Sequence, residues 1–214
     1  MLEALSPDFA NAEQVPKTDA RIVASSVEFP SPQGYGTGRG YLVRPASAPP
    51  PAGATTPTRG LPTVLVIHEN RGLNPHIEDI ARRLAVDNFI AFAPDALFPL
   101  GGYPGDEDKA REIFGRLDQA KTREDMLAAA HYLKGVPGGN GKVGAVGFCW
   151  GGSTTNMLAT RLPELAAAVP FYGAAPPSES VAAIQAPLLL MFADNDENVN
   201  RSWPGYEGAL TAAC

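Results

Sequence analysis

Cysteine is scarce in this sequence of 214 residues, which contains Cys149 and Cys214 and no other. Two cysteines are too few for the disulfide framework that stabilises many small secreted domains. The sequence has no run of 18 or more apolar residues, so we expect no transmembrane helix. It also has no cluster of Lys and Arg, and its formal net charge is -6. We therefore expect neither nucleic acid nor a membrane as a partner.

The first residues lack a basic segment followed by an apolar stretch, so they do not resemble a secretory signal. A cytoplasmic location is the default expectation, and a periplasmic one would follow if an export signal had been removed. Hydrophobic residues make up 44% and charged residues 19%, which is typical of a globular chain. The length suits one domain. We expect residues 1–20 to form an N-terminal arm and residues 21–214 to form one α/β domain.

Short apolar runs alternate with helical patterns along most of the chain. Weak alternation at residues 21–29 and 40–44 predicts two antiparallel strands, and residues 45–60 predict a surface loop. Further strands are predicted at residues 64–67, 89–93, 143–146, 167–171 and 188–192, and helices at residues 76–88, 106–117, 121–134, 151–161 and 203–213. This order implies a mostly parallel sheet flanked by helices, the α/β class. Its chemistry should lie beyond the carboxyl ends of the strands.

Cys149 lies between a predicted strand and a predicted helix, in the segment Gly147-Phe148-Cys149-Trp150-Gly151-Gly152. This is the glycine-x-nucleophile-x-glycine spacing of a nucleophile turn, in which larger side chains beside the nucleophile would clash with the backbone. The helix that follows should favour a thiolate, and the Trp150 N–H is placed to donate to an oxyanion. A buried inert cysteine is the alternative, but the context favours a nucleophile.

The loop after the strand at residues 64–67 reads His68-Glu69-Asn70-Arg71-Gly72. In a fold of this type the loop supplies a second oxyanion N–H, which we assign to Asn70. Glu69 should then lie beside the thiol. We interpret His68 as a packed, hydrogen-bonded residue. Arg71 is either a surface cation or a substrate-binding residue.

The segment Asp194-Asn195-Asp196 follows the predicted strand at residues 188–192. The acid of a catalytic triad is expected at this point of the chain, and both aspartates qualify by position. A solvated turn is the plain alternative, because Asp and Asn favour turns. A Ca²⁺ loop is disfavoured because the remaining ligands and the glycine of such loops are missing.

Together these motifs resemble the dienelactone hydrolase family, over roughly residues 21–210. The specific part of the resemblance is a cysteine in the nucleophile turn combined with a glutamate in the oxyanion loop. It implies a Cys-His-Asp triad with Cys149 as nucleophile and Asp196 as the acid. It also implies that Glu69 helps to deprotonate the thiol when substrate binds, that Asn70 and Trp150 bind the oxyanion, and that Tyr172 lies in the pocket.

The sequence departs from that family in two places. Family members that cleave dienelactone carry an Arg shortly after the Pro-Asp segment, whereas residues 96–102 contain none. The triad His should follow the acid, yet the three histidines are His68, His76 and His131, all before Asp196. We therefore expect a domain without the last strand, the catalytic His and the closing helix, which should expose an unpaired sheet edge and an apolar surface.

The leading hypothesis is hydrolysis of a small-molecule ester or lactone through a thioester on Cys149. No cofactor and no metal is expected. The alternative is a catalytically impaired fragment or scaffold that acts through binding or needs a complementary segment. A homo-oligomer or a complementary C-terminal fragment is a possible partner. A redox thiol protein is disfavoured because there is no C-x-x-C motif.

Overall fold

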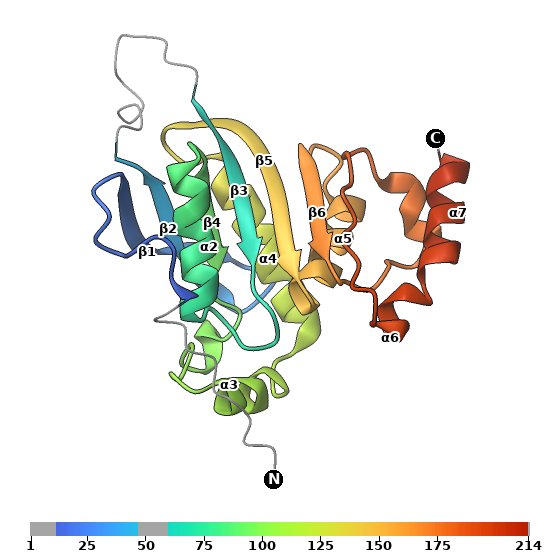
Figure 1. Cartoon of the computed structure of the whole chain (residues 1–214), viewed down its shortest axis with the longest axis horizontal. Coiled ribbons are helices and arrows are strands. Elements are labelled where there is room, and N and C mark those ends of the chain that lie inside the picture. The colour runs from blue at the N-terminus through green and yellow to red at the C-terminus, as the bar shows by residue number, and fades with distance from the viewer. Residues whose placement is uncertain (1–11, 47–59, 214) are drawn as a thin grey trace.

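The computed structural model describes residues 12–46 and 60–213, which form a mixed sheet with helices on both faces (Figure 1). The predicted loop at residues 45–60 lies mostly outside the described residues, as does much of the predicted arm at residues 1–20. Within the described ranges, no helix is long and apolar enough to cross a membrane.

The sheet has six strands in the order β1-β2-β4-β3-β5-β6. Their bounds are β1 Ile22–Ser31, β2 Gly36–Pro45, β3 Leu61–Ile67, β4 Ile90–Pro94, β5 Gly139–Phe148 and β6 Ala167–Phe171. The first two strands form the predicted antiparallel pair, and β2 runs antiparallel to β4. The remaining neighbours are parallel, so β3, β5 and β6 all end at the same edge of the sheet.

The helices are α2 Pro75–Val86, α3 Glu107–Phe114, α4 Gln119–Lys134, α5 Trp150–Arg161, α6 Glu197–Asn200 and α7 Trp203–Ala213. Two 3₁₀ helices, η1 Phe98–Leu100 and η2 Ser178–Ala183, and the short α6 were not predicted. The start of α2 shows why the sequence patterns succeed. The Asn74 side chain accepts a hydrogen bond from the Ile77 N–H at 3.1 Å, and Pro75 occupies the first helical position.

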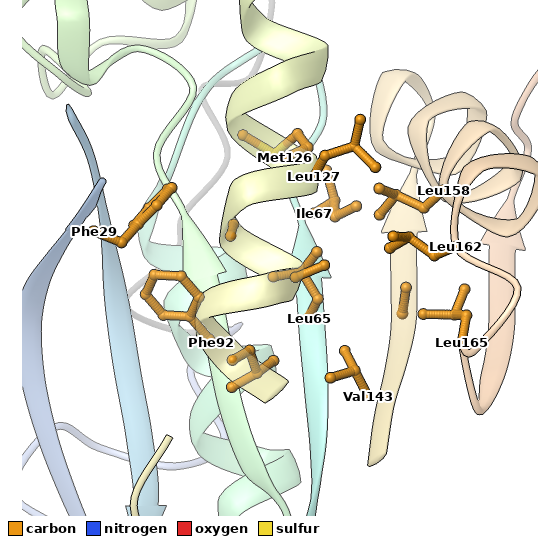
Figure 2. Close-up of a cluster of buried hydrophobic side chains, with 14 of the residues drawn as sticks. Phe29, Leu65, Ile67, Phe92, Met126, Leu127, Val143, Leu158, Leu162 and Leu165 are labelled. Atoms are coloured by element: carbon orange, nitrogen blue, oxygen red, sulfur yellow. The ribbon is translucent and has the colours of Figure 1, made fainter. Parts of the chain in front are cut away.

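The two faces of the sheet carry separate hydrophobic cores. In Figure 1, α2 lies on the near face, while α4 and α5 lie behind the sheet. The near core contains Ile77, Ala81 and Val66. The far core is larger, and Figure 2 shows its side chains between the helices and the strands, among them Leu65 and Phe92. Burial of these apolar faces is the main force that holds the helices against the sheet.

The predicted strand at residues 188–192 is wrong. The segment lies beside β6 but pairs with it at two isolated positions, Ala168 with Leu188 and Phe171 with Met191. Pro170 stands between these positions and has no N–H to donate, so the hydrogen-bond ladder is interrupted there. Leu189 and Phe192 are 59% and 40% exposed, so the expected apolar edge is confirmed.

A groove of about 710 Å³ lies between α2 and the strands β3, β5 and β6. Most of its lining is apolar, and the larger side chains are Val64, Ile80, Leu84, Val146, Phe148, Val169 and Phe171. This confirms the expectation of an apolar surface on one face of the sheet. Phe148 and Phe171 each directly precede a residue of the candidate site, so one end of the groove lies near that site.

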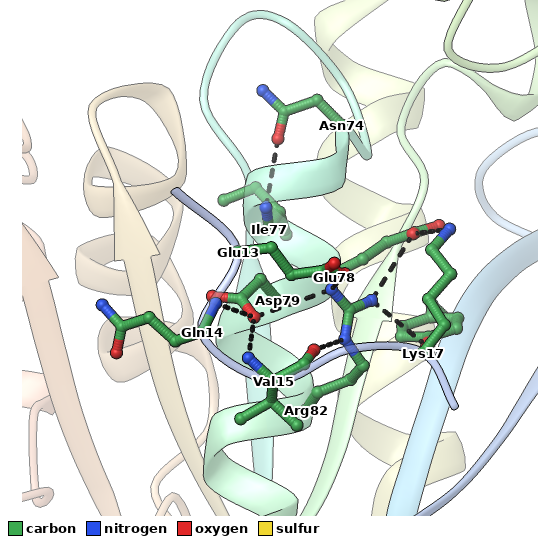
Figure 3. A network of polar contacts seen from close by, with 10 residues as sticks. Glu13, Gln14, Val15, Lys17, Asn74, Ile77, Glu78, Asp79 and Arg82 are labelled. Atoms are coloured by element: carbon green, nitrogen blue, oxygen red, sulfur yellow. Dashed lines mark hydrogen bonds and ion pairs between the residues drawn. The ribbon is translucent and has the colours of Figure 1, made fainter. Parts of the chain in front are cut away.

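Residues 13–15 are tied to α2 through the buried Arg82, whose side chain is 1% exposed (Figure 3). Its Nε donates to the Val15 carbonyl at 2.5 Å, and Nη2 lies 2.7 Å from Glu13 Oε1 and 3.6 Å from Asp79 Oδ1. Asp79 also accepts the backbone N–H of Val15 at 2.9 Å. A charge buried this deeply needs all of these partners.

We expect Arg82→Met to destabilise the fold by about 3 kcal/mol, because it leaves the buried Asp79 carboxylate without its cation. Urea denaturation would measure the loss. Arg83→Met is the matched control, since Arg83 is the next residue of α2 and is exposed. Equal stability of the two variants would contradict the assigned role of the Arg82 network.

Candidate active site

Cys149 occupies a sharp turn between β5 and α5. Its backbone has φ 53° and ψ -109°, a strained conformation for a residue with a side chain, and the residue is exposed. The Cys149 N–H donates to the Phe171 carbonyl at 3.0 Å, and the Cys149 carbonyl accepts from the Ser153 N–H at 3.0 Å. The turn thus presents the thiol at the sheet edge, and a buried inert cysteine is excluded.

The flanking glycines have the steric role that the sequence predicted. A Cβ on Gly147 would lie 2.1 Å from the Gly151 carbonyl oxygen, and one on Gly151 would lie 2.2 Å from the Ile67 carbonyl oxygen. A Cβ on Gly152 would lie 2.4 Å from the Phe171 carbonyl oxygen. The turn therefore packs directly against the ends of β3 and β6, and no side chain fits in between.

Two carboxylates from other loops act on the Cys149 thiol. Burial raises the pKa of the Cys149 thiol, and the negative charges of Glu69 and Asp196 raise this pKa further. The backbone N–H of Trp150 lowers this pKa, but its effect does not outweigh the others. The helix start therefore acts in the predicted direction, but burial and the acidic neighbours outweigh it, so the net shift of the Cys149 pKa is upward.

The two aspartates of the acidic segment lie in different surroundings. Asp196 is half-buried and acts on the thiol pKa, whereas Asp194 is exposed. The Asp196 carboxylate accepts the Val199 N–H at 3.1 Å and caps α6. This cap holds the carboxylate at the edge where β5 ends.

The loop after β3 also forms part of the site. The Glu69 carboxylate accepts a hydrogen bond from the Tyr172 hydroxyl at 3.0 Å. Asn70 is the next residue and is half-buried. Arg71 lies 3.5 Å from Glu107 of α3, and Glu107 also accepts the Tyr103 hydroxyl at 2.8 Å. Arg71 is therefore engaged in an ion pair, although its buried Nε has no partner within the described residues.

His68 is a structural residue, as interpreted from the sequence. It is fully buried, its Nδ1 contacts the Glu69 carbonyl, and its Nε2 accepts the Ala96 N–H at 3.1 Å. Burial lowers its pKa to about 4, so the ring is neutral at pH 7. Its ring stacks on Trp150 at a centroid distance of 5.5 Å. Within the described ranges, no histidine is among the groups that shift the Cys149 pKa.

The sequence did not reveal several residues that support the site. Gln119 accepts the Trp150 indole N–H at 3.1 Å, and the Ser153 hydroxyl accepts the Ala174 N–H at 2.9 Å. Ser153 lies one helical turn after Cys149, a spacing that could have indicated it. Gln119 is 31 residues from Trp150, and no pattern signals that contact.

The segment after Pro94 lacks an Arg of its own but receives one from β2. Arg39 lies over the Phe98 ring at 4.3 Å and 3.7 Å from Asp95. Burial raises the pKa of Asp95 to about 6, although the Leu97 N–H and Arg39 act in the opposite direction. No local pattern predicts this cation, because Arg39 comes from a strand that is distant in the sequence.

A mixed sheet with flanking helices and a nucleophile turn after a central strand defines the α/β-hydrolase fold. The sequence model of the "Dienelactone hydrolase family" matches residues 51–213, and this chain belongs to that family. The chain is 30% identical to a "Putative carboxymethylenebutenolidase" of Escherichia coli over 210 residues, which is 92% of this chain and 72% of that protein.

Two further comparisons agree. The chain is 50% identical over 118 residues to the "Putative hydrolase fragment YghX" of Escherichia coli, which covers 55% of this chain and 93% of that protein. It also resembles the crystal structure of a "Putative Dienelactone Hydrolase" from Klebsiella pneumoniae, with 26% identity and a TM-score of 0.69. That match covers 89% of this chain and 82% of the other.

Proposed function

We propose that this chain is an ester or lactone hydrolase that uses Cys149 as its nucleophile. The observation that carries the proposal is the exposed Cys149 residue in a strained turn, where the charges of Glu69 and Asp196 act on its thiol. Such turns are found where a nucleophile must be presented to a carbonyl group. Membership of a hydrolase family supports the reaction type.

The first half of the proposed reaction forms a thioester. Glu69 accepts the thiol proton when substrate binds, and the Cys149 sulfur attacks the carbonyl carbon. The backbone N–H groups of Asn70 and Trp150 stabilise the oxyanion of the tetrahedral intermediate. Its collapse breaks the C–O bond, the alkoxide leaving group takes up a proton, and the acyl group remains on sulfur. Arg71 and Tyr172 line the substrate pocket in this proposal.

The second half hydrolyses the thioester. Water attacks the acyl carbon, and the carboxylic acid leaves as the thiol is restored. The resemblance to the family implies that a His oriented by Asp196 activates this water. No His follows Asp196 in this sequence. We therefore propose that the 214-residue chain acylates faster than it deacylates. Residues 96–102 contain no Arg, whereas the resemblance implies that an Arg there holds the carboxylate of dienelactone. Dienelactone itself is therefore not the proposed substrate.

The test is stopped-flow hydrolysis of a panel of p-nitrophenyl esters and small lactones. We expect a burst of one p-nitrophenolate per chain, followed by a slow phase. Cys149→Ser, whose alcohol is a much weaker nucleophile than a thiol, should lose the burst. A Cys149→Ser variant that keeps the full burst would contradict the nucleophile assignment.

A second candidate function is binding of a complementary polypeptide segment that supplies a His. The apolar groove of about 710 Å³ beside β5 and β6 favours it, because apolar surfaces of this kind mark sites of interaction. Native mass spectrometry of the protein from its own cells would test it. A bound His-containing segment is expected, and a lone chain or a homo-oligomer with full turnover would contradict it.

A further inference from the structure

Tyr172 connects two loops that are 103 residues apart in the sequence. Its hydroxyl donates to Glu69 Oε1 at 3.0 Å, which joins the segment after β6 to the segment after β3. The turn that presents Cys149 lies on β5, between these two strands in the sheet. The hydroxyl–carboxylate contact therefore spans the strand that carries the nucleophile.

The backbone fixes the position of the Tyr172 ring. Tyr172 has a φ of 38°, in the left-handed region that side chains rarely adopt. Its N–H donates to the Met191 carbonyl at 2.7 Å, and a Cβ on the next residue, Gly173, would lie 2.2 Å from the Gly152 carbonyl carbon. Phe171 accepts the Cys149 N–H. Strain of this kind persists only where the surroundings enforce it. Here the surroundings are the turn at Cys149 and the start of α5, against which residues 171–173 pack.

The charges near Tyr172 keep its hydroxyl available as a donor. Burial raises the Tyr172 pKa, and the negative charge of Glu69 and the Cys149 thiolate raise it further, so the phenol stays protonated at neutral pH. A hydrogen bond to an ionised carboxylate is stronger than one between neutral groups. The Tyr172 hydroxyl thus holds the Glu69 side chain in one place.

We propose that Tyr172 is a positioning residue that holds the Glu69 carboxylate beside the Cys149 thiol. The importance of this role for catalysis rests on the proposed function, in which Glu69 accepts the thiol proton. Glu69 can do so only from a defined position. Tyr172 itself exchanges no proton and touches no reacting atom in this role. It acts through Glu69, so its effect must vanish when Glu69 loses its charge.

The experiment is the pH dependence of Cys149 alkylation by iodoacetamide, followed by mass spectrometry in a Cys214→Ser background. Without its donor, the Glu69 carboxylate is no longer held beside the sulfur, so its charge opposes thiolate formation less strongly. We therefore expect Tyr172→Phe to move the midpoint downward by about half a pH unit or more. Glu69→Gln should move it downward, because the negative charge is gone. Adding Tyr172→Phe to Glu69→Gln should change nothing further.

Tyr103→Phe is the matched control, because Tyr103 donates to Glu107 at 2.8 Å in the same manner. Its alkylation midpoint should equal that of the parent chain. An unchanged or raised midpoint in Tyr172→Phe would overturn the proposal, and so would an equal shift with and without Glu69. Alkylation needs no ester turnover, so a chain that follows this pattern but never forms an acyl-thioester would refute the proposed function and leave the positioning role intact.

Discussion

Cys149→Ala is expected to lower the rate of acylation by p-nitrophenyl acetate about a thousandfold or more. The reason is that the proposed first step makes a carbon–sulfur bond, and no other described side chain occupies the turn between β5 and α5. Intact-mass measurement should show one added acetyl group in the parent chain and none in the variant. Peptide mapping should place the acetyl group on Cys149.

The remaining cysteine provides the matched control. Cys214→Ser removes a thiol that has no part in the proposed mechanism, so its acylation rate should equal that of the parent chain. An acetyl group mapped to Cys214, or to a lysine, would show that the labelling is non-specific. In that case the chain would remain a member of a hydrolase family without a demonstrated nucleophile.

Gly151→Ala is expected to destabilise the fold by about 3 kcal/mol, although Gly to Ala inside a helix normally gains up to about 1 kcal/mol. The added Cβ would lie 2.2 Å from the Ile67 carbonyl oxygen and 2.6 Å from that of His68. Both contacts are to backbone, so α5 must move away from the end of β3. The acylation rate should fall as well, because Cys149 moves with α5.

Gly208→Ala in α7 is the control for this prediction, since a Cβ there meets no atom within 4 Å. Urea denaturation should show this variant to be as stable as the parent chain or slightly more stable. If Gly151→Ala were also neutral, the close approach of α5 to β3 would be wrong. If Gly151→Ala lowers the free energy of unfolding and Gly208→Ala raises it, the loss at Gly151 comes from steric strain and not from helix propensity.

The succession of strands and helices followed well from local patterns. The predicted strand at residues 167–171 and the predicted helix at residues 203–213 match β6 and α7 at both ends. Other boundaries moved by several residues, as in β5, which begins at Gly139 instead of residue 143. Periodicity marks the buried part of a strand, whereas its exposed ends depend on the neighbouring strand.

The segment at residues 188–192 shows the limit of this reasoning. Its apolar run is typical of a buried strand, but Leu189 and Phe192 are exposed. A segment becomes a regular strand only if it can form a continuous series of hydrogen bonds with the neighbouring strand. Pro170 of β6 has no N–H, so one of these hydrogen bonds is missing. That loss is visible only when β6 and the segment lie side by side.

The strained turn at Cys149 could be predicted from the sequence because its requirements are local. A strand, two small residues and a helix start within a few positions impose the geometry of Cys149 through steric exclusion alone. The ionisation of Cys149 could not be identified in this way. Its pKa depends on burial and on the charges of Glu69 and Asp196, which reach the sulfur from separate loops. Electrostatic effects depend on distance in space, so only the folded sheet decides that these two carboxylates raise the pKa of the thiol and that the Tyr172 hydroxyl donates to Glu69.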